Sequence, residues 1–298
     1  MIRMKTFILA ILFFTGVLAA QSGKNLIIRC DDIGMSHAVN LAAQEMTATG
    51  IPFSASVMFV CPWYLEAVEI LKNQPHVTAG IHLTLNAEWK NYRWGPVAGK
   101  DAVPSLVDEN GFFFPSRGTL FANNPNTAEI EKELRAQIER ALKSGLKVEY
   151  VDYHMGTAVD KPEYRAIVEN LAGEYNLGIS RYFGEIDVNS MYFASPEKKI
   201  DTLINTVNKL NDSIYSLLVC HIGKDTPELA AMVDLNIIGP NEMSKNRNAE
   251  LEALKSKEFS ETLKKNNVEL ITYSDLIKKI GLENMESPLN PGIKIYGK

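Results

Sequence analysis

Four apolar stretches of this chain end in side chains that can bind a metal ion or transfer a proton. They finish at Asp31-Asp32, His82, His154 and His221. Successive strands of an α/β barrel direct their carboxyl ends toward one face, so groups at those ends meet however far apart they lie in the sequence. The pattern therefore predicts a parallel α/β fold that gathers these side chains into one site.

Strand-like and helix-like segments alternate along the chain, which is typical of βαβ units around a parallel sheet. After the first apolar run, which ends at Asp32, strands are expected at about 53–60, 77–83, 148–153, 178–182, 214–220 and 268–272. Helices are expected at about 36–49, 62–71, 127–144, 162–175, 196–210 and 249–263, with a last helix capped by Ser274. No glycine-rich phosphate loop follows a strand, which excludes the commonest nucleotide site. The predicted fold class is α/β, a (β/α) barrel that is incomplete or distorted.

Residues from about 86 to 125 break this alternation and form a long insertion after the third strand. The stretch contains Gly95-Pro96, Pro104, Asn110-Gly111 and Pro115, which are turn and loop signals. A hairpin is expected around Asn110-Gly111.

The first 20 residues have the layout of a secretory signal peptide. Arg3 and Lys5 precede an apolar run from Phe7 to Leu18, and Ala19-Ala20 offers a cleavage site; an uncleaved membrane anchor is the alternative. Cleavage would leave residues 21–298, or 298 − 20 = 278 residues, a normal size for one barrel domain. The expectation is an exported protein, periplasmic or secreted, without a membrane span after signal removal.

The formal net charge of −5 argues against a nucleic-acid partner, which needs basic patches. The three cysteines, Cys30, Cys61 and Cys220, form no recognisable disulfide framework. Buried free thiols are expected instead. Whether the chain forms a homo-oligomer is left open.

The strand-end residues have the chemistry of an open metal site. One carboxylate and two imidazoles make a three-ligand set that leaves a position for water or substrate. A remaining aspartate and a remaining histidine then supply a base and an acid for hydrolysis of an amide or ester. The alternatives are that Asp31-Asp32 caps the helix near Ser36 and that His82 is a satisfied core residue. Asp152 is expected to hydrogen-bond a ligating imidazole, unless it is an ordinary surface carboxylate.

Five segments, in order, resemble the YdjC-like carbohydrate deacetylases. They are Cys30–Ser36, Gly80–Leu85, Asp152–His154, Cys220–Gly223 and Arg247–Leu254. The resemblance spans about residues 25 to 280. It implies a barrel-like fold distantly related to polysaccharide deacetylases, one divalent metal ion, Mg²⁺, and removal of acetyl groups from N-acetylated mono- or oligosaccharides.

The same resemblance implies roles for individual residues. Asp32, His82 and His154 match the metal ligands, Asp31 the general base and His221 the general acid. Arg247 matches a basic position that orients Asp31 or binds substrate, with a surface salt bridge as the alternative. The chain departs from the family pattern at Ile33, at Ile222 and at Gly156, where a second histidine is missing. Two imidazoles and a carboxylate would also suit Zn²⁺ by ligand softness.

Trp89 and Trp94 in the insertion are candidate substrate-binding residues, since aromatic faces pack against sugar rings. The alternative is that these rings fasten the insertion to the barrel. Two other functions stay open: another metallohydrolase, acting on esters or phosphoesters, and a non-catalytic sugar-binding protein, which the missing histidine would favour.

Overall fold

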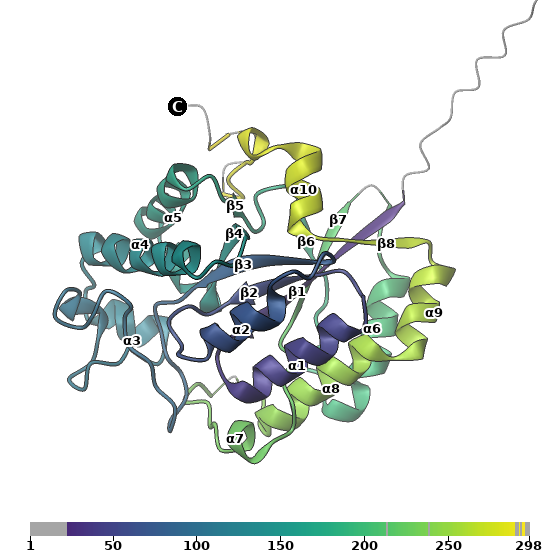
Figure 1. Cartoon of the computed structure of the whole chain (residues 1–298), viewed down its shortest axis with the longest axis horizontal. Coiled ribbons are helices and arrows are strands. Elements are labelled where there is room, and N and C mark those ends of the chain that lie inside the picture. The colour runs from purple at the N-terminus through teal and green to yellow at the C-terminus, as the bar shows by residue number, and fades with distance from the viewer. Residues whose placement is uncertain (1–22, 213, 238, 290–291, 293, 296–298) are drawn as a thin grey trace, which may run out of the picture.

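The computed structural model describes residues 23–212, 214–237, 239–289, 292 and 294–295. Its centre is a curled, parallel half-barrel of strands in the order β5-β4-β3-β2-β1-β7-β6, with β8 also paired to β1 (Figure 1). The strands are β1 (Lys24–Ile33), β2 (Phe53–Val57), β3 (Val77–Leu83), β4 (Val148–Tyr153), β5 (Gly178–Ile179), β6 (Ile186–Asp187), β7 (Tyr215–Cys220) and β8 (Val268–Ile271). The prediction of an incomplete (β/α) barrel is confirmed.

Helices surround this sheet in Figure 1, and each helix that the sequence predicted has a counterpart. The helices are α1 (His37–Ala48), α2 (Tyr64–Leu71), α3 (Arg117–Ala122), α4 (Thr127–Lys143), α5 (Pro162–Glu174), α6 (Lys199–Asn208), α7 (Pro227–Ala230), α8 (Met243–Lys255), α9 (Lys257–Lys265) and α10 (Tyr273–Ile280). Of these, α3 and α7 were not foreseen. Ser36 caps α1 by accepting a hydrogen bond from the Val39 amide.

Several elements differ from the sequence-based expectation. The helix expected at 249–263 is two helices, because Ser256 has an extended backbone and caps α9 through the Phe259 amide. The strand expected at 178–182 is shorter, and β6 was not foreseen. Thr272, not Ser274, caps α10, since Thr272 and Asp275 form a reciprocal capping box.

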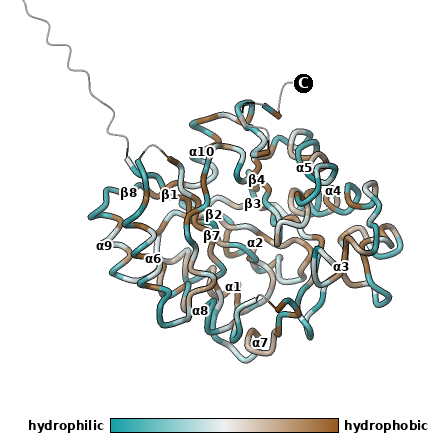
Figure 2. Tube along the Cα trace, turned by 180° about the vertical axis from the view of Figure 1, so that it is seen from behind, coloured by the Kyte–Doolittle hydropathy of each residue, from teal (hydrophilic) through white to brown (hydrophobic). Residues whose placement is uncertain are grey.

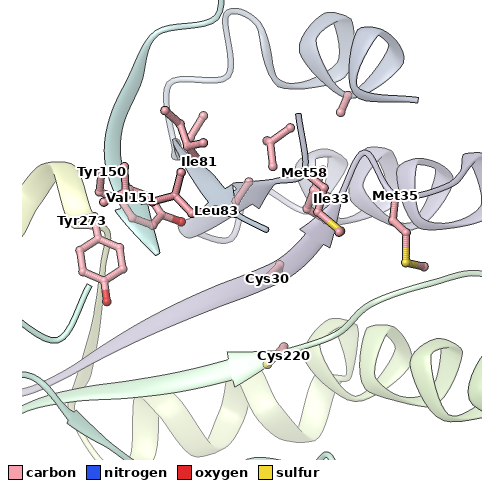
Figure 3. Close-up of a cluster of buried hydrophobic side chains, with 14 of the residues drawn as sticks. Cys30, Ile33, Met35, Met58, Ile81, Leu83, Tyr150, Val151, Cys220 and Tyr273 are labelled. Atoms are coloured by element: carbon pink, nitrogen blue, oxygen red, sulfur yellow. The ribbon is translucent and has the colours of Figure 1, made fainter. Parts of the chain in front are cut away.

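The core lies between the sheet and its helices. Figure 2 shows hydrophobic residues along the central strands and hydrophilic stretches on the outer helices. In Figure 3, Tyr150 of β4 and Tyr273 of α10 lie side by side, with ring centroids 4.3 Å apart. Gly80 lies beneath the Tyr150 ring, where a Cβ would come within 2.3 Å of it. Cys30 and Cys220 face each other in register across β1 and β7, and all three cysteines are free and buried, as predicted.

The insertion after β3 is mostly irregular and is fastened to α4. Glu133 of α4 is fully buried and accepts hydrogen bonds from the backbone amides of Val97 and Ala98. The expected turn at Asn110-Gly111 is present, closed by an antiparallel bridge between Val107 and Phe113. The Glu133 contacts fasten the insertion to the helix that precedes β4.

The predicted signal peptide falls on residues 1–20, which lie outside the described residues. The described chain starts with β1, and no apolar N-terminal helix precedes that strand within it. No helix of the described residues is long and apolar enough to cross a bilayer. Nothing in the described residues supports the predicted signal sequence or a secreted protein. The exported or periplasmic location stays a prediction.

Candidate metal centre and active site

The end of β1 is bent so that two adjacent carboxylates can serve different purposes. The register between β1 and β2 shifts between Cys30 and Ile33. Asp32 has a left-handed backbone with φ 63°, and Gly34 follows with φ 86°. Such a bulge changes the direction of a side chain at a strand end. Asp31 and Asp32 are both buried, yet they have different partners.

Three ligand-type atoms meet at the carboxyl ends of β1, β3 and β4. Asp32 Oδ1 lies 3.4 Å from His82 Nε2 and 3.2 Å from His154 Nδ1. The two ring nitrogens are themselves 3.2 Å apart. Asp32 Oδ1 is buried and has no hydrogen-bond partner among the described residues. The residues predicted as metal ligands therefore lie together.

Each of these imidazoles has a second carboxylate behind it. His82 Nδ1 lies 3.0 Å from Asp152 Oδ1, its cross-strand neighbour on β4. His154 Nε2 lies 2.9 Å from Glu88 Oε2. A ligating histidine typically donates its outer N–H to a carboxylate, which directs the inner nitrogen at the metal. Sequence reasoning anticipated Asp152 but missed Glu88, because nothing in the insertion signals an approach to His154.

The donor set fits a divalent cation. Atoms bound to one ion at about 2.1 Å lie roughly 3.0–3.4 Å from each other in octahedral or tetrahedral geometry. The three separations here fall in that range. The surrounding charge agrees: burial alone would lower the pKa of His82, but Asp152 and Asp31 raise it to about 9. Burial likewise opposes the charge of His154, while Glu88 and Asp32 raise its pKa well above the ordinary value. The buried carboxylates around the two imidazoles thus favour positive charge at this position.

Asp31 lies beside this set, close to His82 and Asp152, and pairs with Arg29. Arg29 Nε and Nη2 donate to the two Asp31 oxygens, each at 2.7 Å, and Arg29 Nε lies 2.9 Å from Asp152 Oδ2. Burial would raise the pKa of Asp31, but the guanidinium and the nearby histidines lower it to about 2. Asp31 is therefore an ionised carboxylate beside the metal ligands. Arg29 was missed because it lies inside an apolar run.

Arg247 of α8 pairs with Asp32 and not with Asp31. Arg247 Nη2 donates to Asp32 Oδ2 at 2.6 Å, while its Nε and Nη1 are buried without a hydrogen-bond partner among the described residues. Its guanidinium lies 5.7 Å from the centre of the Trp89 ring. Because Arg247 is buried, the alternative of a surface salt bridge is excluded. The unpaired donors are free to bind another group.

His221 follows β7 and lies within electrostatic reach of both aspartates. Burial lowers its pKa below the ordinary value, against the attraction of Asp32 and Asp31. Its backbone N–H donates to Glu250, and its ring packs on Tyr192 with centroids 5.0 Å apart. Its Nδ1 is buried without a partner in the part of the chain that the structure describes. This imidazole is available to exchange a proton.

Trp89 and Trp94 are almost fully buried, with 1% and 4% of their surfaces exposed. Trp94 Nε1 donates to the Asn86 carbonyl, and the Trp94 ring lies edge-on to His154 at 6.3 Å. Burial favours the alternative in which the two rings fasten the insertion to the barrel and pack behind the site.

Gly156 occupies the position at which the family pattern has a second histidine. The preceding residue, Met155, is 40% exposed, and its sulfur accepts a hydrogen bond from Asn86.

Comparison with known proteins places these residues in a family context. Residues 25–265 match the family described as YdjC-like protein. A carbohydrate deacetylase of Brevibacillus brevis is 30% identical over 264 residues, covering 84% of this chain and 99% of that protein. A carbohydrate deacetylase of Enterococcus faecalis is 28% identical over 268 residues, covering 86% and 99%. A solved structure from Enterococcus faecalis, named as a candidate cellobiose-phosphate cleavage protein, has a TM-score of 0.70 at 24% identity and covers 86% of this chain and 99% of its own.

Proposed function

The chain belongs to the YdjC-like protein family, and on that premise we propose that it is a metal-dependent carbohydrate deacetylase. Its substrates are N-acetylated mono- or oligosaccharides, and the reaction hydrolyses the amide bond of the acetamido group. Relatives of nearly full-length coverage that are named carbohydrate deacetylases support this proposal. One observation carries it. A carboxylate oxygen of Asp32 without a hydrogen-bond partner among the described residues lies between two imidazole nitrogens, and beside it Arg29 keeps the Asp31 carboxylate ionised.

Asp32, His82 and His154 would hold the ion. A divalent cation bound there would polarise the acetamide carbonyl and lower the pKa of a water molecule. The resemblance to the family suggests Mg²⁺, whereas two imidazoles and one carboxylate suit Zn²⁺ by ligand softness. Metal analysis of the purified protein, followed by reloading with each ion, decides between them.

Asp31 is the proposed general base. Its carboxylate accepts a proton from the attacking water, and Arg29 keeps it ionised until then. A base must be deprotonated at the working pH, and the low pKa of Asp31 meets that condition. Asp32 is not free for this task because Arg247 occupies its second oxygen.

His221 is the proposed general acid, which donates a proton to the departing sugar amine. Its Nδ1 has no hydrogen-bond partner among the described residues, so the ring is not committed to another group. The unpaired Nε and Nη1 donors of Arg247 are proposed to bind the substrate while Nη2 holds Asp32 in place. Trp89 and Trp94 support the loop behind these groups rather than contacting sugar directly.

The test is acetate release from N-acetylated saccharides by the metal-loaded protein. We expect turnover to stop on chelation and to return on adding metal. We expect Asp31→Asn to lower kcat by about 100-fold or more, since general base catalysis typically contributes that much. Asp160→Asn, at an exposed ion pair with Arg117, is the matched control and should keep full activity. Normal turnover by the Asp31→Asn protein would reject the assigned base.

A further inference from the structure

Lys199 and Glu250 form a buried ion pair outside the proposed ligand set. The pair contacts the backbone of His221 and the segment that packs against the His221 ring. Lys199 begins α6 and Glu250 lies on α8; their exposed fractions are 0% and 2%. Their charged groups are 3.2 Å apart. Burying two charges costs desolvation energy that their attraction often does not recover. Stability alone is therefore a weak reason for this pair.

Lys199 uses all three of its donors inside the protein. Its Nζ donates to the carbonyl oxygens of Met191 and Tyr192, at 2.7 and 3.1 Å, and to Glu250 Oε1. Met191 and Tyr192 belong to the connection between β6 and α6. Lys199 thus fixes the backbone of the segment that carries the Tyr192 ring.

Glu250 uses its other oxygen on the residue that is the proposed acid. Glu250 Oε2 accepts a hydrogen bond from the backbone N–H of His221 at 2.7 Å. The Tyr192 ring packs on the His221 ring, with an interplanar angle of 58°. One ion pair therefore holds the backbone of His221 and the wall against which its ring lies. Within the described residues, His221 Nδ1 has no hydrogen bond that could hold the ring instead.

We propose that Lys199 and Glu250 are positioning residues that orient the imidazole of His221; the catalytic consequence rests on the proposed function of that residue. Neither side chain is required to touch substrate. The Glu250 carboxylate fixes the strand end, and the Lys199 ammonium fixes the ring's packing surface. A purely structural pair would join α6 to α8 without any specific effect on the proton transfer at His221.

The test replaces both charges at once, as Lys199→Met/Glu250→Leu, so that neither is left buried alone. Hydrogen exchange is measured on the peptide that contains the His221 amide, without reference to activity. We expect the amide to exchange about tenfold faster or more, because its acceptor is gone. The control is Lys255→Met/Glu45→Gln, which removes a partly exposed ion pair anchored on the same helix α8 and should leave this exchange unchanged. Unchanged protection in Lys199→Met/Glu250→Leu would overturn the inference.

Kinetics then separate positioning from general structural support. We expect kcat to fall about 10- to 100-fold, as for a misplaced catalytic group, with KM within about twofold. In a His221→Ala background the same double substitution should change kcat by less than about twofold, because no imidazole remains to be positioned. Equal losses in both backgrounds would overturn the positioning role.

Glu250→Gln keeps an oxygen acceptor, so this variant should retain more of the kcat and of the exchange protection than Lys199→Met/Glu250→Leu. Equal impairment of the two variants would contradict the assigned hydrogen bond. Failure of the unsubstituted protein to release acetate would reject the proposed function, while the exchange rate of the His221 amide would still decide whether the pair holds that residue.

Discussion

At the scale of single residues, the site separates two neighbouring carboxylates by giving each its own arginine. Arg29 holds Asp31 and Arg247 holds Asp32, and both arginines are buried. Only Asp32 is left with an unpartnered oxygen toward the two imidazoles. The adjacent aspartates can therefore act as a base and a metal ligand without exchanging roles.

The pairing of Asp31 makes stability depend on acid pH. Its pKa is about 2 in the folded protein, below the ordinary 3.8, so this pairing contributes about 2 kcal/mol above pH 4. The contribution is lost as pH falls from about 4 to about 2, because the unfolded chain takes up the proton first. Arg29→Met should remove this acid dependence and cost about 3–5 kcal/mol, since it leaves carboxylates buried without their cation. Urea unfolding of both proteins across that pH range checks this; an unchanged slope would contradict it.

Gly80 gives a purely steric prediction. A methyl group there would meet the Tyr150 ring at 2.3–2.6 Å, and that ring is buried against Tyr273. We expect Gly80→Ala to destabilise the protein by about 1–3 kcal/mol, the usual cost of overpacking a core. Gly118→Ala is the control, because a Cβ there would lie 3.9 Å from the Ser116 hydroxyl and Gly118 is in a helix, where alanine is favoured. Thermal unfolding compares the two; equal midpoints would show that the core yields at Tyr150.

At the scale of elements, α4 fastens the insertion through the carboxyl group of Glu133, whose burial disfavours its charged form. Burial raises the pKa of Glu133 to about 7, although the Ala98 and Val97 amides and Gln137 oppose this. The folded protein therefore holds a proton that the unfolded chain loses above pH 4.5. Unfolding free energy should fall by about 3 kcal/mol as pH rises from 4.5 to 7. This dependence should be absent in Glu133→Gln; a parallel pH profile in that variant would assign it to other groups.

The elements also show where sequence reasoning succeeds. The strand ends at Asp32, His82 and His154 could be located because apolar runs mark parallel strands, and parallel strands bring their carboxyl ends together. The helix break at Ser256 was missed because the apolar pattern continues across it, while a cap depends on backbone geometry.

Contacts between residues that are distant in the sequence were harder to predict. Glu88 and His154 are separated by 66 residues, and Lys199 and Glu250 by 51. Their pairing follows from how the insertion and α8 pack, which no local pattern encodes. Burial also decided the position of Trp89 and Trp94, since an aromatic residue in a loop can face either substrate or core.

At the scale of the whole molecule, an ion at this site should join three strands of the half-barrel. Ligands bind the folded state selectively, so saturation at about 1,000 times Kd adds about 4 kcal/mol to the unfolding free energy. Chelation should lower the thermal midpoint of the wild-type protein and leave that of His82→Ala unchanged. A thermal midpoint that chelator leaves unchanged in both proteins would argue against a bound ion.

The most direct test of the account is an anomalous difference map from crystals of the protein loaded with Zn²⁺, or with Mn²⁺ in place of Mg²⁺, collected at the absorption edge of that metal. We predict one peak per chain, bounded by Asp32 Oδ1, His82 Nε2 and His154 Nδ1, with Asp31 still held by Arg29. A peak bound by other residues, or no peak among these three atoms in crystals that contain the metal, would contradict it.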